Sequence, residues 1–292
     1  MLEFTKRLKI FEHNMDTALN SNAIFPAMRL GVTKFSDLTA AEFKASRLTL
    51  HPDSKLVTAP QAVKKTPVIA KSLPEYFDWR DRDLVLQPAK DQGACGASWA
   101  FSSLATVEAL YAISTKTRSP DLSAQFHVDC DVKSNGCGHT VYSNALKFII
   151  DNGVHQTSDY GAYTGVPAKC DLTKKSPFVF RPKGFWSTDD FKKQGVLSFD
   201  VALMQMTLQN PTAITLNAGL LQLYVSGIVP PTNCTTLVDH SVAVVGWTSE
   251  FYIVRNSWGA DWGDKGYFYM KRSGGDVDFC GMTSGPAYTP YA

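Results

Sequence analysis

The sequence of 292 residues lacks the features of several classes of protein. No apolar run approaches the ~18 residues that a membrane span requires. No signal peptide is visible, because charged side chains follow Met1 from position 3 onward. The formal net charge is only +2, which is too weak to indicate binding to nucleic acid. We therefore expect neither a membrane nor a nucleic acid among the partners of this chain.

Cysteine is missing from the first 94 residues, and the chain has no Cys-x-x-Cys pair. The absence of this spacing, which is typical of zinc and redox sites, argues against such a site, and we expect neither a metal nor another cofactor. The cysteines that are present form an even count in one segment, which indicates a disulfide framework and an oxidising compartment. Six cysteines allow 15 pairings, and the residues alone do not choose among them. They are Cys95, Cys130, Cys137, Cys170, Cys234 and Cys280.

Charge is divided unevenly along the chain. Residues 1–72 contain 11 Lys and Arg against 6 Asp and Glu, whereas the remaining residues contain 18 against 21. A basic front piece and an acidic body would attract each other, although chance composition accounts for the imbalance equally well.

The chain is organised around a glycine-marked loop, residues 92–98, that leads into a long apolar segment, residues 99–113. The segment contains no proline or glycine and one charge, Glu108, so we expect a helix that is buried nearly all round. Ser98 then lies at the helix N-terminus, where unpaired N–H groups and the helix dipole stabilise an anionic nucleophile. Serine is also a preferred N-cap, which would give Ser98 a purely structural role.

Two segments far downstream carry residue types that acyl transfer needs. His240 precedes an apolar run that ends in Gly-Trp, and Asn256 opens the run Asn-Ser-Trp-Gly. An imidazole can act as a base, and an amide can orient it. Together with Cys-Gly-Ala-Ser-Trp at residues 95–99, these segments resemble the papain and cathepsin family, whose signature is Cys-Gly-(Ser or Ala)-Cys-(Trp or Tyr) with a distant His and Asn. The departure is Ser98, which stands where the family has its catalytic cysteine.

The resemblance implies a role for each of these residues. His240 is expected as the base, Asn256 as the residue that orients its ring, and Trp258 as the cover over that pair. Gln92 is expected to donate its amide to the oxyanion, beside the backbone N–H of Ser98. The resemblance also implies the disulfides Cys95–Cys137, Cys130–Cys170 and Cys234–Cys280.

The front of the chain resembles a cathepsin L-type prosegment, the alternative being an unrelated small helical domain. Residues 1–22 match the ERFNIN pattern, with Ala18 in place of isoleucine, and residues 31–37 match a second prosegment motif, with Thr33 in place of asparagine. A capping box from Thr39 to Glu42 predicts a short helix. The family's first prosegment helix has no counterpart, so we expect a truncated or recombinant chain. An apolar stripe at helical spacing consists of Phe4, Leu8, Phe11, Met15 and Leu19.

Residues 48–72 are rich in Pro, Lys, Ala and Val without periodicity, which predicts an extended linker. The resemblance implies that this linker passes through the active-site cleft in the direction opposite to a substrate. Residues 73–80 resemble the family's mature N-terminus, so we expect processing between Ala70 and Leu73. The expected units are then an inhibitory prosegment, residues 1–72, and a protease domain, residues 73–292.

The protease domain is expected to have the α+β, papain-like fold of two lobes, a helical lobe over about residues 73–185 and a β-barrel-like lobe over about residues 186–292. Ser123 is expected to cap a helix that ends at Cys130, and residues 141–150 form another helical stripe, closed by Gly153. Strand-like runs occupy residues 213–216, 241–247, 251–255 and 266–270. The resemblance places Ser98 on the helical wall of the cleft and His240 on the β wall.

Two explanations of Ser98 remain open. In the first, it is an engineered Cys→Ser change that stops a proenzyme from processing itself, because a serine hydroxyl cannot form the thiolate–imidazolium pair with His240. In the second, serine is the natural residue, as in silicateins and some non-proteolytic homologues. We therefore expect either an inactive cysteine endopeptidase proenzyme or a non-proteolytic or silicatein-like homologue.

The positions that form the family's S2 pocket carry no charge here, which predicts a hydrophobic residue at P2 of the substrate. They are Val141, Tyr142, Thr215, Val238, Ser241 and Gly285. His139 and Thr140 replace a pair of glycines that the family has beside this pocket.

We expect a monomer that is lysosomal, vacuolar or secreted, with peptides or proteins as substrates and its own prosegment as inhibitor. Secretory entry would make the sequon at Asn233 usable.

Overall fold

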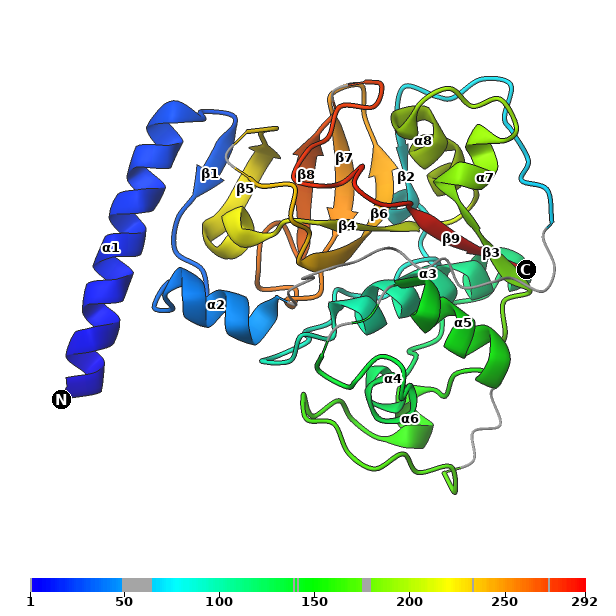
Figure 1. The fold of residues 1–292 in the computed structure, drawn as a ribbon, viewed down its shortest axis with the longest axis horizontal. Helices are drawn as coiled ribbons and strands as arrows, with labels where there is room; N and C mark the ends of the chain where they lie inside the picture. Colours follow the sequence, from blue (N-terminus) through cyan, green and yellow to red (C-terminus); the bar gives the residue numbers. More distant parts are fainter. Residues whose placement is uncertain are drawn as a thin grey trace.

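The computed structural model describes residues 2–48, 65–138, 140, 142–174, 180–232, 234–272 and 274–292. These residues form two lobes, a helical one and one built on a sheet, with an N-terminal region against the sheet lobe (Figure 1). The expected α+β fold of two lobes with a helical N-terminal region is confirmed. Among the described residues, no helix is long and apolar enough to cross a bilayer.

The helical lobe is assembled around α3 (Ser98–Thr115), whose residues are apolar nearly all round and mostly buried. It packs against α4 (Ala124–Cys130) and α5 (Tyr142–Asn152), and α6 (Thr157–Tyr160) follows. The Ser123 side chain accepts a hydrogen bond from the Phe126 N–H and caps α4, as predicted. Gly153 follows α5 with φ of +80°, a conformation that glycine adopts without strain.

The second lobe contains a sheet in the order β1-β5-β8-β7-β6-β4-β9-β3, with β2 also paired to β6. All residues of β6 are buried, which explains its continuous apolar sequence. The predicted strands correspond to β4, β6, β7 and β8 within one residue. The strands are β1 (Met28–Leu30), β2 (Phe77–Asp78), β3 (Gly184–Ser187), β4 (Thr212–Leu216), β5 (Tyr224–Val229), β6 (His240–Trp247), β7 (Phe251–Arg255), β8 (Tyr267–Lys271) and β9 (Tyr288–Tyr291).

The second lobe also contains helices that the sequence did not predict. Two helices, α7 (Thr188–Lys192) and α8 (Phe199–Gln209), lie between β3 and β4. Ser187 and Asp190 form a capping box that begins α7, and the Ser198 side chain accepts from the Val201 N–H to begin α8. Short 3₁₀ turns follow β2 and β4, namely η1 (Trp79–Asp81) and η2 (Gly219–Leu223).

The N-terminal region, residues 2–48, contains α1 (Leu2–Ile24), β1 and α2 (Ala40–Arg47). The predicted helix over residues 1–22 and the capping box of Thr39 and Glu42 are confirmed. The apolar stripe of α1, however, is only partly covered: Met15 packs against the core, whereas Phe4, Leu8 and Leu19 are exposed. Phe4 is 73% exposed, whereas the buried residues of α1 are Asn14 and Ala18.

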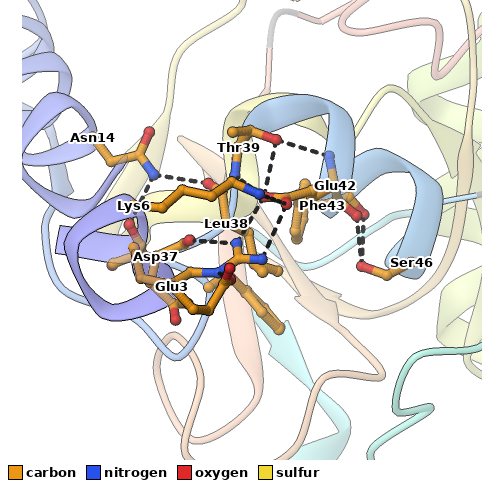
Figure 2. Close-up of polar contacts among 12 residues, drawn as sticks. Glu3, Lys6, Asn14, Asp37, Leu38, Thr39, Glu42, Phe43 and Ser46 are labelled. Atoms are coloured by element: carbon orange, nitrogen blue, oxygen red, sulfur yellow. Dashed lines mark hydrogen bonds and ion pairs between the residues drawn. The ribbon is translucent and has the colours of Figure 1, made fainter. Parts of the chain in front are cut away.

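Polar contacts join α1 to the turn before α2, as Figure 2 shows. Arg7 donates to both carboxylate oxygens of Glu42, at 2.8 and 3.1 Å, and Asn14 donates to the carbonyls of Ser36 and Leu38. The Arg7 guanidinium lowers the pKa of Glu42 to about 2, so this pair stays charged at mildly acidic pH. Strand β1 continues the contact by pairing antiparallel with β5.

Three disulfides are present, and they are the pairs that the family resemblance implies. Cys95–Cys137 and Cys130–Cys170 lie in the helical lobe, and Cys234–Cys280 lies in the sheet lobe. No described cysteine is free.

Residues 65–72 have no regular secondary structure, in agreement with an extended linker. The linker expected to pass through a cleft comprises residues 48–72, and most of it, residues 49–64, lies outside the described residues.

Candidate active site

Ser98 lies at the junction of the two lobes. It is the first residue of α3 and is 1% exposed, and the N-cap is Ala97, so a capping role for Ser98 is wrong. The Ser98 Oγ accepts a hydrogen bond of 3.2 Å from the backbone N–H of Ser241, the second residue of β6. The hydroxyl therefore connects the start of the helical lobe's main helix to the strand that carries His240.

His240 and Asn256 come from neighbouring strands of the sheet. His240 begins β6 and Asn256 follows the last residue of β7, and these two strands pair antiparallel. The His240 Nε2 and the Asn256 Oδ1 are 2.8 Å apart. Because the amide oxygen accepts, Nε2 carries the proton and Nδ1 is the basic nitrogen, which has no hydrogen-bond partner in the described structure. That nitrogen is the one able to take a proton from a nucleophile.

Burial decides the charge of His240. The ring is 2% exposed, and its desolvation lowers the pKa of His240 to about 4, against the opposing effect of the hydrogen bond to Asn256. At neutral pH the imidazole of His240 is therefore neutral in this structure. The adjacent Asp239 is buried as well, and desolvation raises its pKa to about 6.

Trp258 lies against the ring of His240. Its ring is fully buried and its centroid lies 4.8 Å from the centroid of the His240 ring. Two aromatic rings of the N-terminal region, Phe35 and Phe43, contact Trp258 edge-on at 5.5 and 5.3 Å. The N-terminal region thus seals the side of the site that Trp258 forms.

The Gln92 side chain is held in one orientation by partners on both ends of its amide. Its Oε1 accepts from the Ser257 hydroxyl at 2.6 Å, and its Nε2 donates to the Cys95 carbonyl at 2.8 Å. The same Nε2 donates to the carbonyl of Arg47, the last residue of α2, at 2.9 Å. A carbonyl of the N-terminal region therefore lies at the amide that the sequence marks as an oxyanion donor.

The residues expected to form the substrate pocket are only partly brought together. Thr215 and Ser241 are paired neighbours on β4 and β6, and Val238 and Gly285 are half-buried. Tyr142 is buried instead, with its hydroxyl 2.8 Å from the Thr106 hydroxyl inside the helical lobe. Val141, His139 and Asn233 lie outside the described residues.

Several contacts at the site have no clear signal in the sequence. The Ser241 N–H and the Arg47 carbonyl are backbone groups, which any residue type would supply. Lys34 could have been noticed as a charge inside the second prosegment-like motif. Its Nζ lies 2.7 Å from Asp91 and 2.9 Å from Asp261, so it ties the N-terminal region to the loops of Gln92 and Trp258.

Comparison with known proteins gives a consistent result. A family model described as papain family cysteine protease matches residues 73–290. "Cysteine protease 1" of Oryza sativa subsp. japonica is 34% identical over 284 residues, 93% of this chain and 56% of the rice protein. Papain of Carica papaya is 31% identical over 286 residues, 97% of this chain and 79% of that protein. The chain belongs to the papain family of cysteine proteases.

Solved structures of proforms share the fold over nearly the whole chain. The proform of the ragweed pollen cysteine protease Amb a 11 has a TM-score of 0.85 and 26% identity, covering 98% of this chain and 80% of that one. Digestive procathepsin L 3 of Tenebrio molitor has a TM-score of 0.81 and 26% identity, covering 100% and 93%. The chain spans 56% of the rice protein and 62% of cysteine proteinase RD21A of Arabidopsis thaliana.

Proposed function

We propose that the chain is the autoinhibited proform of a papain-like endopeptidase that lacks only its nucleophilic thiol. Residues 1–72 act as the inhibitory prosegment and residues 73–292 as the peptidase domain. The observation that carries the proposal is the hydrogen bond from Gln92 Nε2 to the Arg47 carbonyl. It puts a prosegment carbonyl at the donor that a substrate oxyanion would need, so the prosegment and a substrate compete for one place.

The chemistry follows from the geometry of the candidate site. A thiol at position 98 would lose its proton to Nδ1 of His240, and the helix N-terminus would stabilise the thiolate. The thiolate attacks the scissile carbonyl, and Gln92 and the position-98 N–H stabilise the oxyanion. The imidazolium then protonates the leaving amine, while Asn256 holds the ring. Water completes the hydrolysis of the acyl-enzyme.

With serine at position 98, the surrounding residues His240, Asn256 and Gln92 keep their positions, but the reactive thiol is missing. The hydroxyl is far less acidic than a thiol, and in this structure Ser98 Oγ accepts from Ser241 instead of donating to His240. A thiol-containing peptidase changed at one residue accounts for this pattern. A naturally serine-bearing, non-proteolytic or silicatein-like homologue is the second candidate, which Ser98 itself favours.

For the substrate, we propose a hydrophobic residue at P2. Thr215, Val238 and Ser241 are uncharged and lie on or beside strands that flank the site. Three disulfides favour an oxidising compartment, so we place the protein in a lysosome, a vacuole or the extracellular space. We propose that it acts as a monomer.

The test is the Ser98→Cys protein, incubated at about pH 5 with a thiol reductant and a library of fluorogenic peptides. We expect loss of the prosegment and cleavage with Leu, Val or Phe at P2, whereas the parent protein stays inert. Preference for Arg at P2 would refute the pocket assignment. Absence of both processing and cleavage would favour the non-proteolytic homologue.

A further inference from the structure

Two loops of the peptidase domain hold a cationic side chain at the rim of the candidate active site. One loop leads into Gln92 and the other contains Trp258, and an isolated β-bridge joins Asp91 to Trp258. The Lys34 Nζ lies across this bridge, 2.7 Å from the Asp91 Oδ2 and 2.9 Å from the Asp261 Oδ1. A group of the N-terminal region therefore neutralises two carboxylates that belong to the peptidase domain.

Gly259 leaves the room that this ammonium group occupies. Its φ is +81°, and a Cβ atom at this position would lie 3.0 Å from the Lys34 Nζ and 2.5 Å from the Asp261 Oδ1. The floor between the two carboxylates is therefore bare backbone, and any side chain there would fill the space. The carboxylates of Asp91 and Asp261 and the backbone of Gly259 are called here the rim cradle.

The rim cradle stays charged and accessible when Lys34 leaves it. The Asp91 Oδ1 accepts from the Gly93 N–H at 2.8 Å, which keeps the Oδ2 directed to the cradle. The side chains of Asp91 and Asp261 are 42% and 69% exposed. The hydrogen bond from Lys34 lowers the pKa of Asp261, and an exposed aspartate without a cation titrates at about 4. The Asp261 carboxylate is thus ionised at pH 5 with or without Lys34.

The rim cradle lies on the side of the site where the leaving amine departs. Trp258 precedes Gly259, and its ring lies against His240, which protonates the leaving amine in the proposed mechanism. Asp91 precedes Gln92, the proposed donor to the oxyanion. The substrate residues that follow the scissile bond are therefore the ones whose long side chains can reach the cradle.

We propose that the rim cradle binds a lysine or arginine side chain of the substrate, in the part that follows the scissile bond, and that Lys34 occupies the cradle until the prosegment is removed. The inference rests on the proposed function and narrows its substrates to peptides with a hydrophobic residue before the bond and a basic residue after it. Because both carboxylates are exposed, they favour a cation over an uncharged side chain by only about threefold to tenfold.

Peptide binding to the inert Ser98 protein tests the cradle without any need for peptidase activity. An added papain-type protease removes the prosegment at acid pH and is then blocked with a thiol-directed epoxide. Fluorescence polarisation compares peptides with Leu at P2 and either Lys or the uncharged norleucine at one of the three positions after the scissile bond. At one position we expect about threefold to tenfold tighter binding of the Lys peptide at low ionic strength, and a smaller difference in about 0.5 M salt.

Asp261→Asn tests whether the rim cradle causes this preference. The change removes one charge from an exposed side chain and keeps its shape, so the preference for Lys should fall to about twofold or less. Asp83→Asn, at another exposed aspartate of the peptidase domain, is the matched control and should keep the preference. Equal binding of the two peptides by the parent, binding of neither, or an unchanged preference in Asp261→Asn would overturn the proposal.

Kinetics of the processed Ser98→Cys protein separate this inference from the proposed function. The ratio of kcat/KM for the Lys and norleucine peptides should show the same preference, which Asp261→Asn loses and Asp83→Asn keeps. Cleavage of both peptides at equal kcat/KM would overturn the rim cradle and leave the endopeptidase standing. An inactive Ser98→Cys protein would defeat the proposed endopeptidase, and the binding comparison on the Ser98 protein would still decide whether the cradle binds a basic side chain.

Discussion

At the scale of single residues, the site is defined by which groups already have partners. His240 Nε2 is engaged by Asn256, and His240 Nδ1 is left without a partner, which is the polarity that a base facing position 98 requires. Gln92 is the reverse case, since both N–H groups and the oxygen of its amide have partners, one of them in the N-terminal region. The unpartnered nitrogen of His240 and the contact of Gln92 with the N-terminal region together support the proposal of a site that is assembled but blocked.

Gln92 provides the first prediction at this scale. In the Ser98→Cys background after removal of the prosegment, Gln92→Ala should lower kcat by about 10²–10³ with little change in KM, because the amide acts on the oxyanion of the transition state. Steady-state kinetics with a fluorogenic peptide gives both values. The control is Gln194→Ala, and a rise in KM at unchanged kcat would assign Gln92 to ground-state binding instead.

His127 provides a second prediction, which concerns stability. It is buried between Trp99 and Phe148 with no partner for either ring nitrogen, and desolvation lowers its pKa to about 3. The unfolded chain takes up a proton below about pH 6.5 and the folded chain does not, so stability falls as the pH drops from 6.5 towards 3.

We expect His127→Leu to recover roughly 2–3 kcal/mol of unfolding free energy at pH 4.5, beyond any change at pH 7.5. Urea unfolding at the two pH values measures the difference, and His13→Leu at an exposed position of α1 is the control. An equal effect of His127→Leu at both pH values would show that packing, and not titration, limits the stability of this lobe.

At the scale of elements, the sequence predicts most of the helices and strands that position the site. The apolar run of α3, the Ser123 cap and the strands β4, β6, β7 and β8 follow from periodicity and capping. α8 was missed because it is shorter than α3 and, like α3, shows no amphipathic period that would mark a helix. The exposed stripe of α1 could not be assigned either, because periodicity shows an apolar face and not what covers it.

The candidate site, like the fold, was predictable from the sequence only in part. Gln92, Ser98, His240, Asn256 and Trp258 are recognisable from motifs, and the structure brings them together. The contacts that close the site were not predictable, because they use backbone carbonyls and N–H groups whose positions depend on the tertiary fold. Tyr142 was placed in the pocket by its position in a motif, but a hydroxyl partner holds it inside the helical lobe.

The element of the N-terminal region that contacts the candidate site through a buried aromatic side chain is α2, which carries Phe43. This side chain is 1% exposed and packs on Phe35 and Trp258. We predict that Phe43→Ala loses about 3–5 kcal/mol of packing and opens the proposed prosegment. Hydrogen exchange of the α2 amides should accelerate, while Phe4→Ala, at a site that is 73% exposed, should leave that exchange unchanged. Unaltered protection in the Phe43 variant would mean that other contacts hold α2.

At the scale of the whole molecule, we predict that acid opens the assembly of the two lobes and the N-terminal region. In the closed form, in which the N-terminal region packs on Trp258 and Gln92, the pKa of His240 is about 4. An imidazole exposed to water titrates near 6.5. Protonation therefore favours the open form, and the closed form loses stability as the pH falls from 6.5 towards 4. The Arg7 and Glu42 pair does not titrate in this window, because the pKa of Glu42 is about 2. Acid is thus expected to open the site without separating α1 from α2.

The most direct test is the rate at which a thiol-directed epoxide labels the Ser98→Cys protein at pH 7 and at pH 4.5. Each rate is divided by the rate for the same protein after removal of the prosegment, which cancels the reagent's own pH dependence. We predict a relative rate of at most about 0.1 at pH 7, because the N-terminal region occupies the amide of Gln92 and packs on Trp258, and a higher relative rate at pH 4.5, where the closed form is less stable. Rapid labelling at pH 7 would contradict a blocked site, and no labelling at either pH would contradict an assembled one.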